Sequence, residues 1–121
     1  MKQLLVLTTL ISSLIMTSVT HAEWTEIDEF RYVDYERVRQ RNNGIYLVWY
    51  LTNATDHGSI TFLVELDCKA IAQKLLTAKV YEKKFASGNV ISKTGPNKNW
   101  QYAEPNSPLE RYWTKVCRKI D

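Results

Sequence analysis

The sequence predicts an α+β domain in which a C-terminal helix is clamped against a β-sheet by a disulfide bond. Three observations lead to this fold class. Short segments rich in β-branched and aromatic residues alternate with turn signals through most of the chain. The last sixteen residues, Asn106 to Asp121, have the pattern of a short capped helix. The two cysteines, Cys68 and Cys117, fall in a strand-like segment and in that helix.

The start of the chain has the pattern of a secretory signal peptide. Lys2 gives a positive start, and an apolar stretch from Leu4 to Met16 follows it. The competing interpretation is a membrane span, which needs about 20 mostly apolar residues. Eight of the eighteen residues from Gln3 to Thr20 are Gln, Ser or Thr, which disfavours a span. We therefore expect an exported protein, periplasmic, secreted or at the cell surface, with no transmembrane segment in its mature chain.

Cleavage is expected between Ala22 and Glu23, because a small residue precedes the cut in such peptides. Residues 1–22 would then be the signal peptide, and residues 23–121 one mature domain of 99 residues. No cysteine stands at that junction, so we expect no bacterial lipid anchor there. The mature chain has 15 basic and 13 acidic side chains, and 15 − 13 = +2 is too mild a net charge to indicate nucleic-acid binding.

The N-terminal half of the domain predicts short strands and a hairpin. Two strands are expected within Glu23–Ile27 and Phe30–Asp34, and Tyr35–Arg41 begins as a turn and continues extended. Asn42–Gly44 then predicts a hairpin turn, since Asn and Gly accept positive φ. Ile45–Thr52 is apolar at both alternating sets of positions, which predicts a central strand covered on both faces, by the helix on one and a partner on the other.

The middle of the chain predicts further strands and contains one ambiguous segment. Ile60–Cys68 alternates as a strand, and Cys68 shares its more apolar face. Residues 70–83 fit either a helix or a strand, because Ala, Lys, Leu and Gln favour a helix while the flanking turn residues favour a strand. Asn89–Ser92 predicts a short strand, and a loop with three prolines follows it.

The C-terminal segment predicts an amphipathic helix from Pro108 to about Lys119. Ser107 is a good N-cap, Pro108 fits the first helical position, and Glu110 completes a capping box. The apolar side chains form one stripe: Leu109, Tyr112, Trp113, Val116, Cys117 and Ile120. Three basic residues lie near the negative C-terminal end of the helix: Lys115, Arg118 and Lys119. We expect the stripe to pack on the sheet face that Cys68 occupies.

Cys68 and Cys117 are expected to form a disulfide. An exported chain meets an oxidising compartment, where two cysteines usually pair. A pair of free buried thiols is the alternative. The bridge would close a loop of about 50 residues, worth roughly 4 kcal/mol in the chain-entropy model. That is a large share of the stability of a domain of this size.

Several motifs together resemble the surface-adhesin protein E family of Gram-negative bacteria. They are VWY in the central strand, then ELDCK, VYEK, SGNV and PNSPLERYW, and the terminal Trp-x-x-x-Cys of Trp113 and Cys117. The resemblance runs from about Trp24 to Cys117. It implies a mostly antiparallel sheet of about six strands, with the C-terminal helix tethered across one face by the disulfide. It also implies a strand for Ile71–Tyr81 and dimerisation through the sheets.

The resemblance further implies a binding module for host extracellular-matrix or serum proteins. The chain departs from the family pattern because it lacks a lipidated cysteine after its signal peptide. The alternative is therefore a periplasmic binding or accessory protein of the cell envelope, with no adhesive role.

Arg37, Arg39 and Arg41 fall at alternating positions and would line one face of an extended segment as a basic row. Such a row would suit an anionic glycan, the phosphates of lipopolysaccharide or an acidic protein partner. The competing interpretation, which we favour, is a charged edge strand that blocks unwanted sheet pairing.

The aromatic residues are numerous for the length of the chain. Trp49 and Trp113 are expected in the core. Tyr46 and Tyr50 are the candidate dimer surface, since tyrosine is enriched at protein interfaces.

No catalytic or metal-binding set can be assembled from the sequence, so we expect neither an enzyme nor a cofactor. Glu65 and Asp67 share a strand face, but without a histidine or third acid nearby they are expected to face solvent or pair with Lys or Arg of a neighbouring strand. His57 is the one histidine of the mature domain and lies in a turn-like loop without a nucleophile motif. Two bonded cysteines leave no thiolate for zinc.

Overall fold

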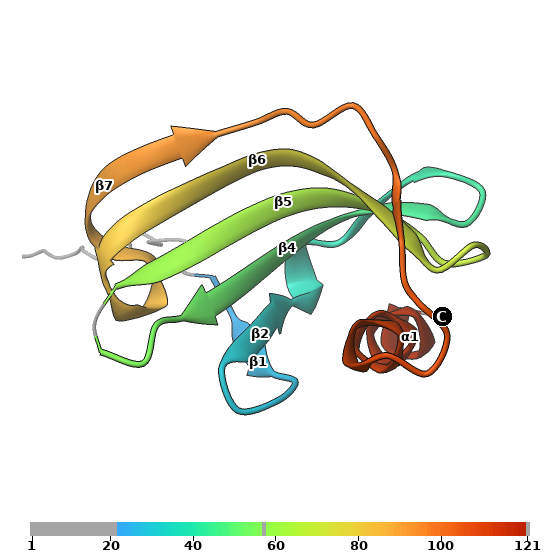
Figure 1. Cartoon of the computed structure of the whole chain (residues 1–121), viewed down its shortest axis with the longest axis horizontal. Helices are drawn as coiled ribbons and strands as arrows, with labels where there is room; N and C mark the ends of the chain where they lie inside the picture. The colour runs from blue at the N-terminus through green and yellow to red at the C-terminus, as the bar shows by residue number, and fades with distance from the viewer. Residues whose placement is uncertain (1–21, 57, 121) are drawn as a thin grey trace, which may run out of the picture.

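The computed structural model describes residues 22–56 and 58–120. The predicted signal peptide lies outside these residues except for Ala22, and so does His57. In the described residues, eight strands form one antiparallel sheet and a single α-helix lies against it (Figure 1). The predicted α+β fold, a mostly antiparallel sheet with a C-terminal helix tethered by a disulfide, is confirmed.

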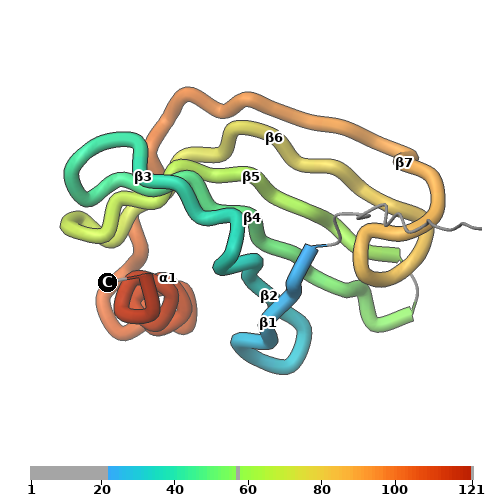
Figure 2. Tube along the Cα trace, turned by 180° about the vertical axis from the view of Figure 1, so that it is seen from behind, coloured from blue at the N-terminus to red at the C-terminus, as the bar shows by residue number. Residues whose placement is uncertain are grey.

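Six strands follow one another across the sheet in the order β1-β2-β4-β5-β6-β7. They are β1 (Trp24–Glu26), β2 (Arg31–Asp34), β4 (Ile45–Asn53), β5 (Ser59–Asp67), β6 (Ala72–Lys83) and β7 (Ser87–Thr94). Two further strands extend the predicted six: β3 (Arg39–Asn42) pairs with β4, and β8 (Gln101–Tyr102) pairs with β6. Figure 2 shows that β3 and the β1–β2 hairpin follow one another along the same side of β4.

β4 is the central strand that the sequence predicted. The hairpin turn before it places Gly44 at φ 82°, a conformation that glycine adopts without strain. β4 then pairs with β5 over its whole length, from Ile45 opposite Asp67 to Asn53 opposite Ser59. This ladder makes β4 and β5 the middle of the sheet.

β6 settles the segment that fitted either a helix or a strand. It is the longest strand and pairs with β5 on one side and β7 on the other. The turn before β6 is capped by Asp67, whose Oδ1 accepts hydrogen bonds from the backbone N–H groups of Lys69 and Ala70 at 2.9 and 3.1 Å. The two sheet ladders outweigh the helix propensity of the segment, as the family resemblance implied.

α1 (Pro108–Ile120) follows a long crossing segment that leaves β7 and turns back to the other side of the molecule (Figure 1). Ser107 Oγ accepts a hydrogen bond from Glu110 N at 3.1 Å, as an N-cap does. Glu110 Oε1 accepts one from Asn106 N at 2.9 Å, one residue further back than in a capping box. Leu109, predicted in the buried stripe, is 41% exposed, because the core contacts of α1 begin one turn later at Tyr112.

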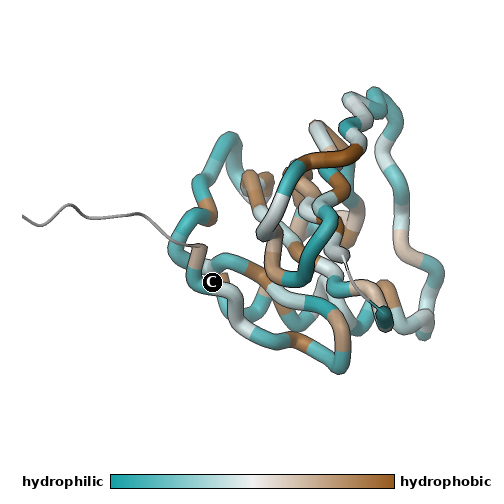
Figure 3. Tube along the Cα trace, turned by 90° about the vertical axis from the view of Figure 1, so that its left-hand side faces the viewer, coloured by the Kyte–Doolittle hydropathy of each residue, from teal (hydrophilic) through white to brown (hydrophobic). Residues whose placement is uncertain are grey.

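The core lies between α1 and one face of the sheet, which we call the helix face. Its buried members are Ile27, Val33, Val48, Tyr50, Val64, Leu66, Tyr112, Trp113, Val116 and Cys117. Trp113 is 1% exposed and is the largest of them, as predicted. Figure 3 shows hydrophobic segments in the middle of the molecule and hydrophilic ones along most of its outline. Burial of each large side chain contributes about 1.5–3 kcal/mol.

The disulfide between Cys68 and Cys117 is present as predicted. It joins the turn after β5 to α1, and the two Cα atoms are 5.6 Å apart. The helix is therefore held to the sheet by a covalent bond as well as by its apolar stripe.

Candidate binding surfaces

The described residues contain neither a metal-ligand group nor a spanning helix. No three His, Cys, Asp or Glu side chains among them are grouped as metal ligands would be. No helix in this part of the chain is long and apolar enough to cross a membrane.

The outward side of α1 is positively charged, and we call it the basic helix surface. Its members are Arg111, Lys115, Arg118 and Lys119, which are all exposed. Their spacing of four, three and one residues places them on one side of the helix. Within the described residues, none of the four lies within 4.0 Å of a carboxylate oxygen. Their charge is therefore not neutralised by ion pairs inside the chain.

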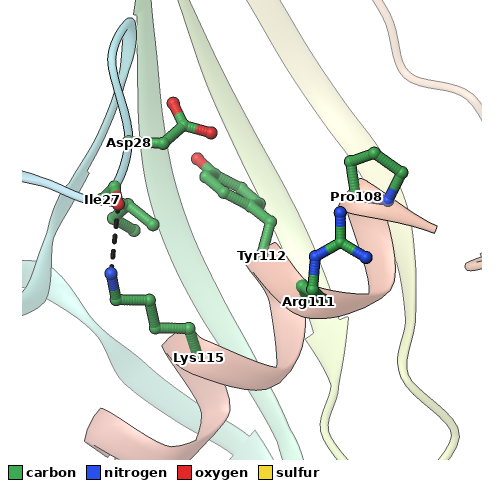
Figure 4. A pocket seen from close by; sticks show the side chains of 6 residues that line it. All are labelled: Ile27, Asp28, Pro108, Arg111, Tyr112 and Lys115. Carbon is green, nitrogen blue, oxygen red and sulfur yellow. Dashed lines mark hydrogen bonds between the residues drawn. The ribbon is translucent and has the colours of Figure 1, made fainter. Parts of the chain in front are cut away.

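A groove of about 210 Å³ separates α1 from the loop between β1 and β2 (Figure 4). Lys115 Nζ crosses the groove and donates a hydrogen bond to the carbonyl oxygen of Ile27 at 3.1 Å. The Tyr112 hydroxyl points toward the Asp28 carboxylate. Burial raises the pKa of Tyr112; the Arg31 guanidinium, 5.4 Å from the ring centre, opposes this rise, and Asp28 adds to it.

Two more hollows border the same cations. One of about 310 Å³ lies between β1 and the last turns of α1, where Lys119 Nζ is 5.7 Å from the centre of the Tyr35 ring. The other, of about 460 Å³, runs along Arg111, Thr114 and Arg118. The basic helix surface is thus an uneven surface with room beside each cation.

The sequence contains the signal for this surface. The helix dipole explains why Lys115, Arg118 and Lys119 lie near the C-terminal end of α1, but it does not account for Arg111 and predicts no binding surface. The spacing predicts one exposed basic side once the opposite stripe is known to face the sheet. The helix dipole still accounts for the position of Arg118 and Lys119 in the last turn.

The structure divides the three arginines that were predicted to form a basic row. Arg37 lies in η1 (Tyr35–Arg37), a 3₁₀ turn between β2 and β3, whereas Arg39 and Arg41 lie in β3. Alternating residues share a face only within a continuous strand. The break at η1 therefore removes Arg37 from the row.

Each of these arginines is also engaged within the chain. Arg37 Nε lies 3.2 Å from the carboxylate of Asp34, and Arg41 Nε lies 3.2 Å from that of Glu65. Glu65 pairs in addition with a lysine of the neighbouring β6 at 3.3 Å, as predicted. Arg39 donates hydrogen bonds to two backbone carbonyls close to it in sequence. Arg37 and Arg41 are thus ion-paired, whereas Arg39, like the cations of the basic helix surface, has no carboxylate partner in the described residues.

The candidate dimer surface at Tyr46 and Tyr50 needs correction, because both residues lie on the helix face. Tyr50 is 4% exposed, and its ring centre is 5.3 Å from that of Tyr112. Tyr46 is half-buried against the same core. The Tyr50 ring is covered by α1, so a second copy has no access to it. Both sets of alternating positions in β4 are apolar, and the sequence therefore could not show which face the helix takes.

The open edge of the sheet at β7 is a surface that the sequence analysis missed. All eight residues of β7 are exposed, and no described strand pairs with its outer side. Val90 and Ile91 are 47% and 62% exposed. A long edge strand with unpaired backbone groups and apolar side chains is a template for pairing with another chain. The adjacent Val and Ile in a polar segment were the signal in the sequence.

Comparison with known proteins gives the family of the chain. The family described as surface-adhesin protein E matches residues 24–118. The chain belongs to this family. The resemblance drawn from the sequence motifs is confirmed, and the chain is by its family an adhesin-like surface protein. None of the curated proteins compared with the chain matches it.

Solved structures of protein E from Haemophilus influenzae have the same fold. Its crystal form II is similar with a TM-score of 0.69 and 13% identity, over 88% of this chain and 96% of that one. A second structure has a TM-score of 0.66 and 15% identity, over 88% and 92%. Protein E from non-typeable Haemophilus influenzae has a TM-score of 0.64 and 13% identity, over 87% and 82%. At such identities the likeness concerns the fold.

Proposed function

We propose that the chain is an exported, non-catalytic binding module that attaches to host extracellular-matrix or serum proteins through the basic helix surface. The observation that supports this proposal is the set of four exposed cations without ion-pair partners in the described residues: Arg111, Lys115, Arg118 and Lys119. Clustered charge of one sign steers an oppositely charged partner and speeds its association. Membership of a surface-adhesin family supports the same function.

The rigidity of α1 adds to the argument. Trp113 is fully packed in the core, and Cys117 is bonded to the sheet. The helix backbone is therefore fixed before a partner arrives, and binding orders only the ends of the basic side chains. A pre-organised surface loses less entropy on association than a mobile one.

A charge-matched pair of variants tests this proposal. The first variant replaces three cations of the surface: Arg111→Ser, Lys115→Ser and Arg118→Ser. The control variant replaces three exposed lysines outside α1 and β7: Lys69→Ser, Lys84→Ser and Lys98→Ser. Both variants lose three positive charges, and the helix variant also loses the hydrogen bonds that Lys115 and Arg111 donate to backbone carbonyls.

Binding of the exported protein to immobilised matrix and serum proteins is measured by surface plasmon resonance at rising salt. We expect the helix variant to lose at least about tenfold in affinity, which corresponds to about 1.4 kcal/mol. The control should stay close to the parent. Parent binding should weaken with salt, because the Debye length falls from about 10 Å at 0.1 M to about 3 Å at 1 M. Equal losses in the two variants would contradict a role for the helix surface.

We propose in addition a homodimer in which the β7 edges of two copies pair. The exposure of the whole strand, with Val90 and Ile91 on it, supports this interface. Sedimentation analysis of Ile91→Lys should show a monomer, because a charge on the edge opposes pairing. The matched control is Phe30→Lys, at another exposed apolar side chain (41%), which should remain dimeric. A parent that is monomeric at every concentration would contradict the proposal.

Location separates the adhesin from a periplasmic accessory protein of the envelope. Antibody labelling of intact cells, with fractionation into periplasm, outer membrane and medium, should find the protein at the surface or in the medium. Retention in the periplasm would favour the accessory role. N-terminal sequencing of the same material should begin at Glu23 if the predicted cleavage after Ala22 occurs.

A further inference from the structure

The sheet face opposite the helix, which we call the open face, contains a cavity of about 240 Å³. It lies over the middle strands, where Thr61 of β5 is paired with Lys79 of β6. The β1–β2 hairpin borders one side and a 3₁₀ turn after β6, η2 (Lys84–Ala86), borders the other. Trp49, predicted in the core, is instead half-buried in the wall of this cavity.

Two buried polar atoms in the wall have no hydrogen-bond partner among the described residues. One is Oγ1 of Thr61, a residue that is 4% exposed. The other is Oδ2 of Asp34, a residue that is 1% exposed. Arg37 Nε lies 3.2 Å from Oδ2, which is an ion-pair distance, but the pair lacks hydrogen-bond geometry. Because buried polar atoms are almost always hydrogen-bonded, these two atoms need a partner from outside the chain, either a water molecule or a polar group of a ligand.

The charges of the cavity favour an anion. Lys79 is half-buried in the wall and has no carboxylate oxygen within 4.0 Å in the described part of the chain. Arg37 is the second cation, and Asp34 is the one carboxylate. Two cations and one carboxylate leave an excess of one positive charge. A ligand with a single negative group would neutralise this remaining positive charge.

The remaining wall is aromatic and sets the shape of the ligand. Trp24, Trp49 and Tyr81 line the cavity and offer flat apolar surface. At roughly 30 Å³ for each water molecule, the volume corresponds to about eight waters. This is below the roughly 300 Å³ at which pockets for drug-sized molecules begin. The cavity therefore suits one small ring with an apolar face and polar groups at its edge.

We propose that this cavity binds one acidic monosaccharide unit, such as a uronic acid, of an anionic glycan. Its carboxylate pairs with Lys79, and its hydroxyl groups donate hydrogen bonds to Asp34 Oδ2 and Thr61 Oγ1. The C–H face of its ring lies against the indoles of Trp24 and Trp49. This site is on the opposite side of the sheet from the basic helix surface, so it is a second site and does not depend on the function proposed above.

Titration with sodium glucuronate tests the proposal. Glucose is the control for an uncharged sugar, and glycine is the control for a small molecule that has a carboxylate but no sugar ring. Ala22 also lines the cavity, and the predicted cleavage would remove it, so the titration uses the exported protein, whose cavity then lacks that residue. Tryptophan fluorescence reports binding directly, because two of the four tryptophans line the cavity. Calorimetry gives the affinity independently. We expect glucuronate to bind at least about tenfold more tightly than glucose.

Two variants locate the site, and a third controls for charge. Thr61→Val and Lys79→Gln should each lower the affinity for glucuronate by about tenfold or more. The first removes the hydrogen bond to a hydroxyl group of the ligand, and the second removes the ion pair with its carboxylate. Thr61→Val leaves no polar atom unpaired, so the variant should fold as the parent does. Lys93→Gln is the charge control, because Lys93 lies directly opposite Lys79 on β7 but outside the cavity, and its affinity should be unchanged.

Selective binding of glucuronate that Thr61→Val and Lys79→Gln weaken and Lys93→Gln does not would support the proposal. Equal affinity for glucose and glucuronate, no binding of glucuronate, binding of glycine in its place, or the same affinity in all three variants would each overturn it.

Discussion

The two faces of the sheet differ in the side chains that they bury, and the nine residues of β5 show this difference. On the helix face, Val64 and Leu66 are fully buried beneath α1. On the open face, Thr61 lines a cavity with an unpartnered hydroxyl, and Glu65 is held between two cations. Unpaired polar groups reduce stability. The helix face therefore carries the contiguous apolar core, whereas the open face buries Leu51 but also keeps polar groups that suit a ligand.

The means of attachment differ in the same way. α1 is held to the helix face by apolar packing and a disulfide. η2 is held to the open face by hydrogen bonds: Asn53 Oδ1 accepts one from Phe85 N at 2.9 Å, and Ser59 Oγ accepts one from Ala86 N at 2.9 Å. Phe85 and Ala86 both have φ of 57°, a conformation that residues other than glycine adopt rarely. These bonds explain why two polar side chains of the open face are buried.

The largest expected effect is on the helix face. Trp113→Ala should lower the free energy of unfolding by about 3–5 kcal/mol, because it removes the largest buried side chain and leaves a cavity. Leu109→Ala is the control on the same helix, at a side chain that is 41% exposed, and should cost less than about 1 kcal/mol. Denaturant unfolding measures both. Similar midpoints for the two variants would show that the helix face is not the source of stability.

The disulfide is a second source of stability on the helix face, because it bonds α1 covalently to the turn after β5. The double variant Cys68→Ser and Cys117→Ser should have a free energy of unfolding lower by about 4 kcal/mol, because the bonded cysteines are 49 residues apart in sequence and close a long loop. Intact mass spectrometry of the parent should show two hydrogens fewer than the reduced formula. Complete alkylation of the native protein without reductant would contradict the bond.

Alkaline pH should lower the free energy of unfolding through two tyrosines of the helix face. Burial raises the pKa of Tyr50 and of Tyr112 above the ordinary value of 10.0. Below that value both tyrosines are protonated in the folded and unfolded chains, so they do not affect stability. As pH rises above about 10, the unfolded chain releases their protons first and the free energy of unfolding falls.

Tyr50→Phe tests this pH dependence by unfolding at pH 7 and pH 11. The Tyr50 hydroxyl has no hydrogen-bond partner among the described residues, so its removal should not lower stability at pH 7. The variant should lose less stability than the parent between the two pH values. Tyr102→Phe, at a ring that is 68% exposed, should follow the parent at both. A loss in Tyr50→Phe as large as the parent's would exclude Tyr50 as a cause.

The helix face was largely predictable from the sequence because burial there repeats with the period of each element. The two-residue alternation of β5 gave the face of Cys68, and the stripe of α1 gave Trp113 and Cys117. β4 was different, since both of its faces are apolar. Only the three-dimensional packing shows that Tyr50 lies under the helix and Trp49 does not.

The open face was not predictable, because its features depend on one local bond and on distant segments. Asp34 Oδ1 accepts a hydrogen bond from Glu36 N at 3.2 Å, which caps η1 and breaks the arginine row. The cavity needs Trp24 from the first strand and Ala86 from η2 on the same side of the sheet. No periodic pattern relates residues so far apart. Sequence motifs gave the family, and the geometry gave the cavity.

The smallest expected effect separates two arginines that the sequence treated as equivalent. Arg37→Ser removes the cation beside Asp34, which is 1% exposed, and should cost about 1–3 kcal/mol because a buried carboxylate loses its partner. The Arg37 side chain is 40% exposed, so solvent screening places the cost toward the lower end. Arg39→Ser removes an exposed side chain that bonds only to nearby carbonyls and should stay within about 0.5 kcal/mol. Denaturant midpoints that are equal for the two variants would mean that the open face does not depend on the Arg37–Asp34 pair.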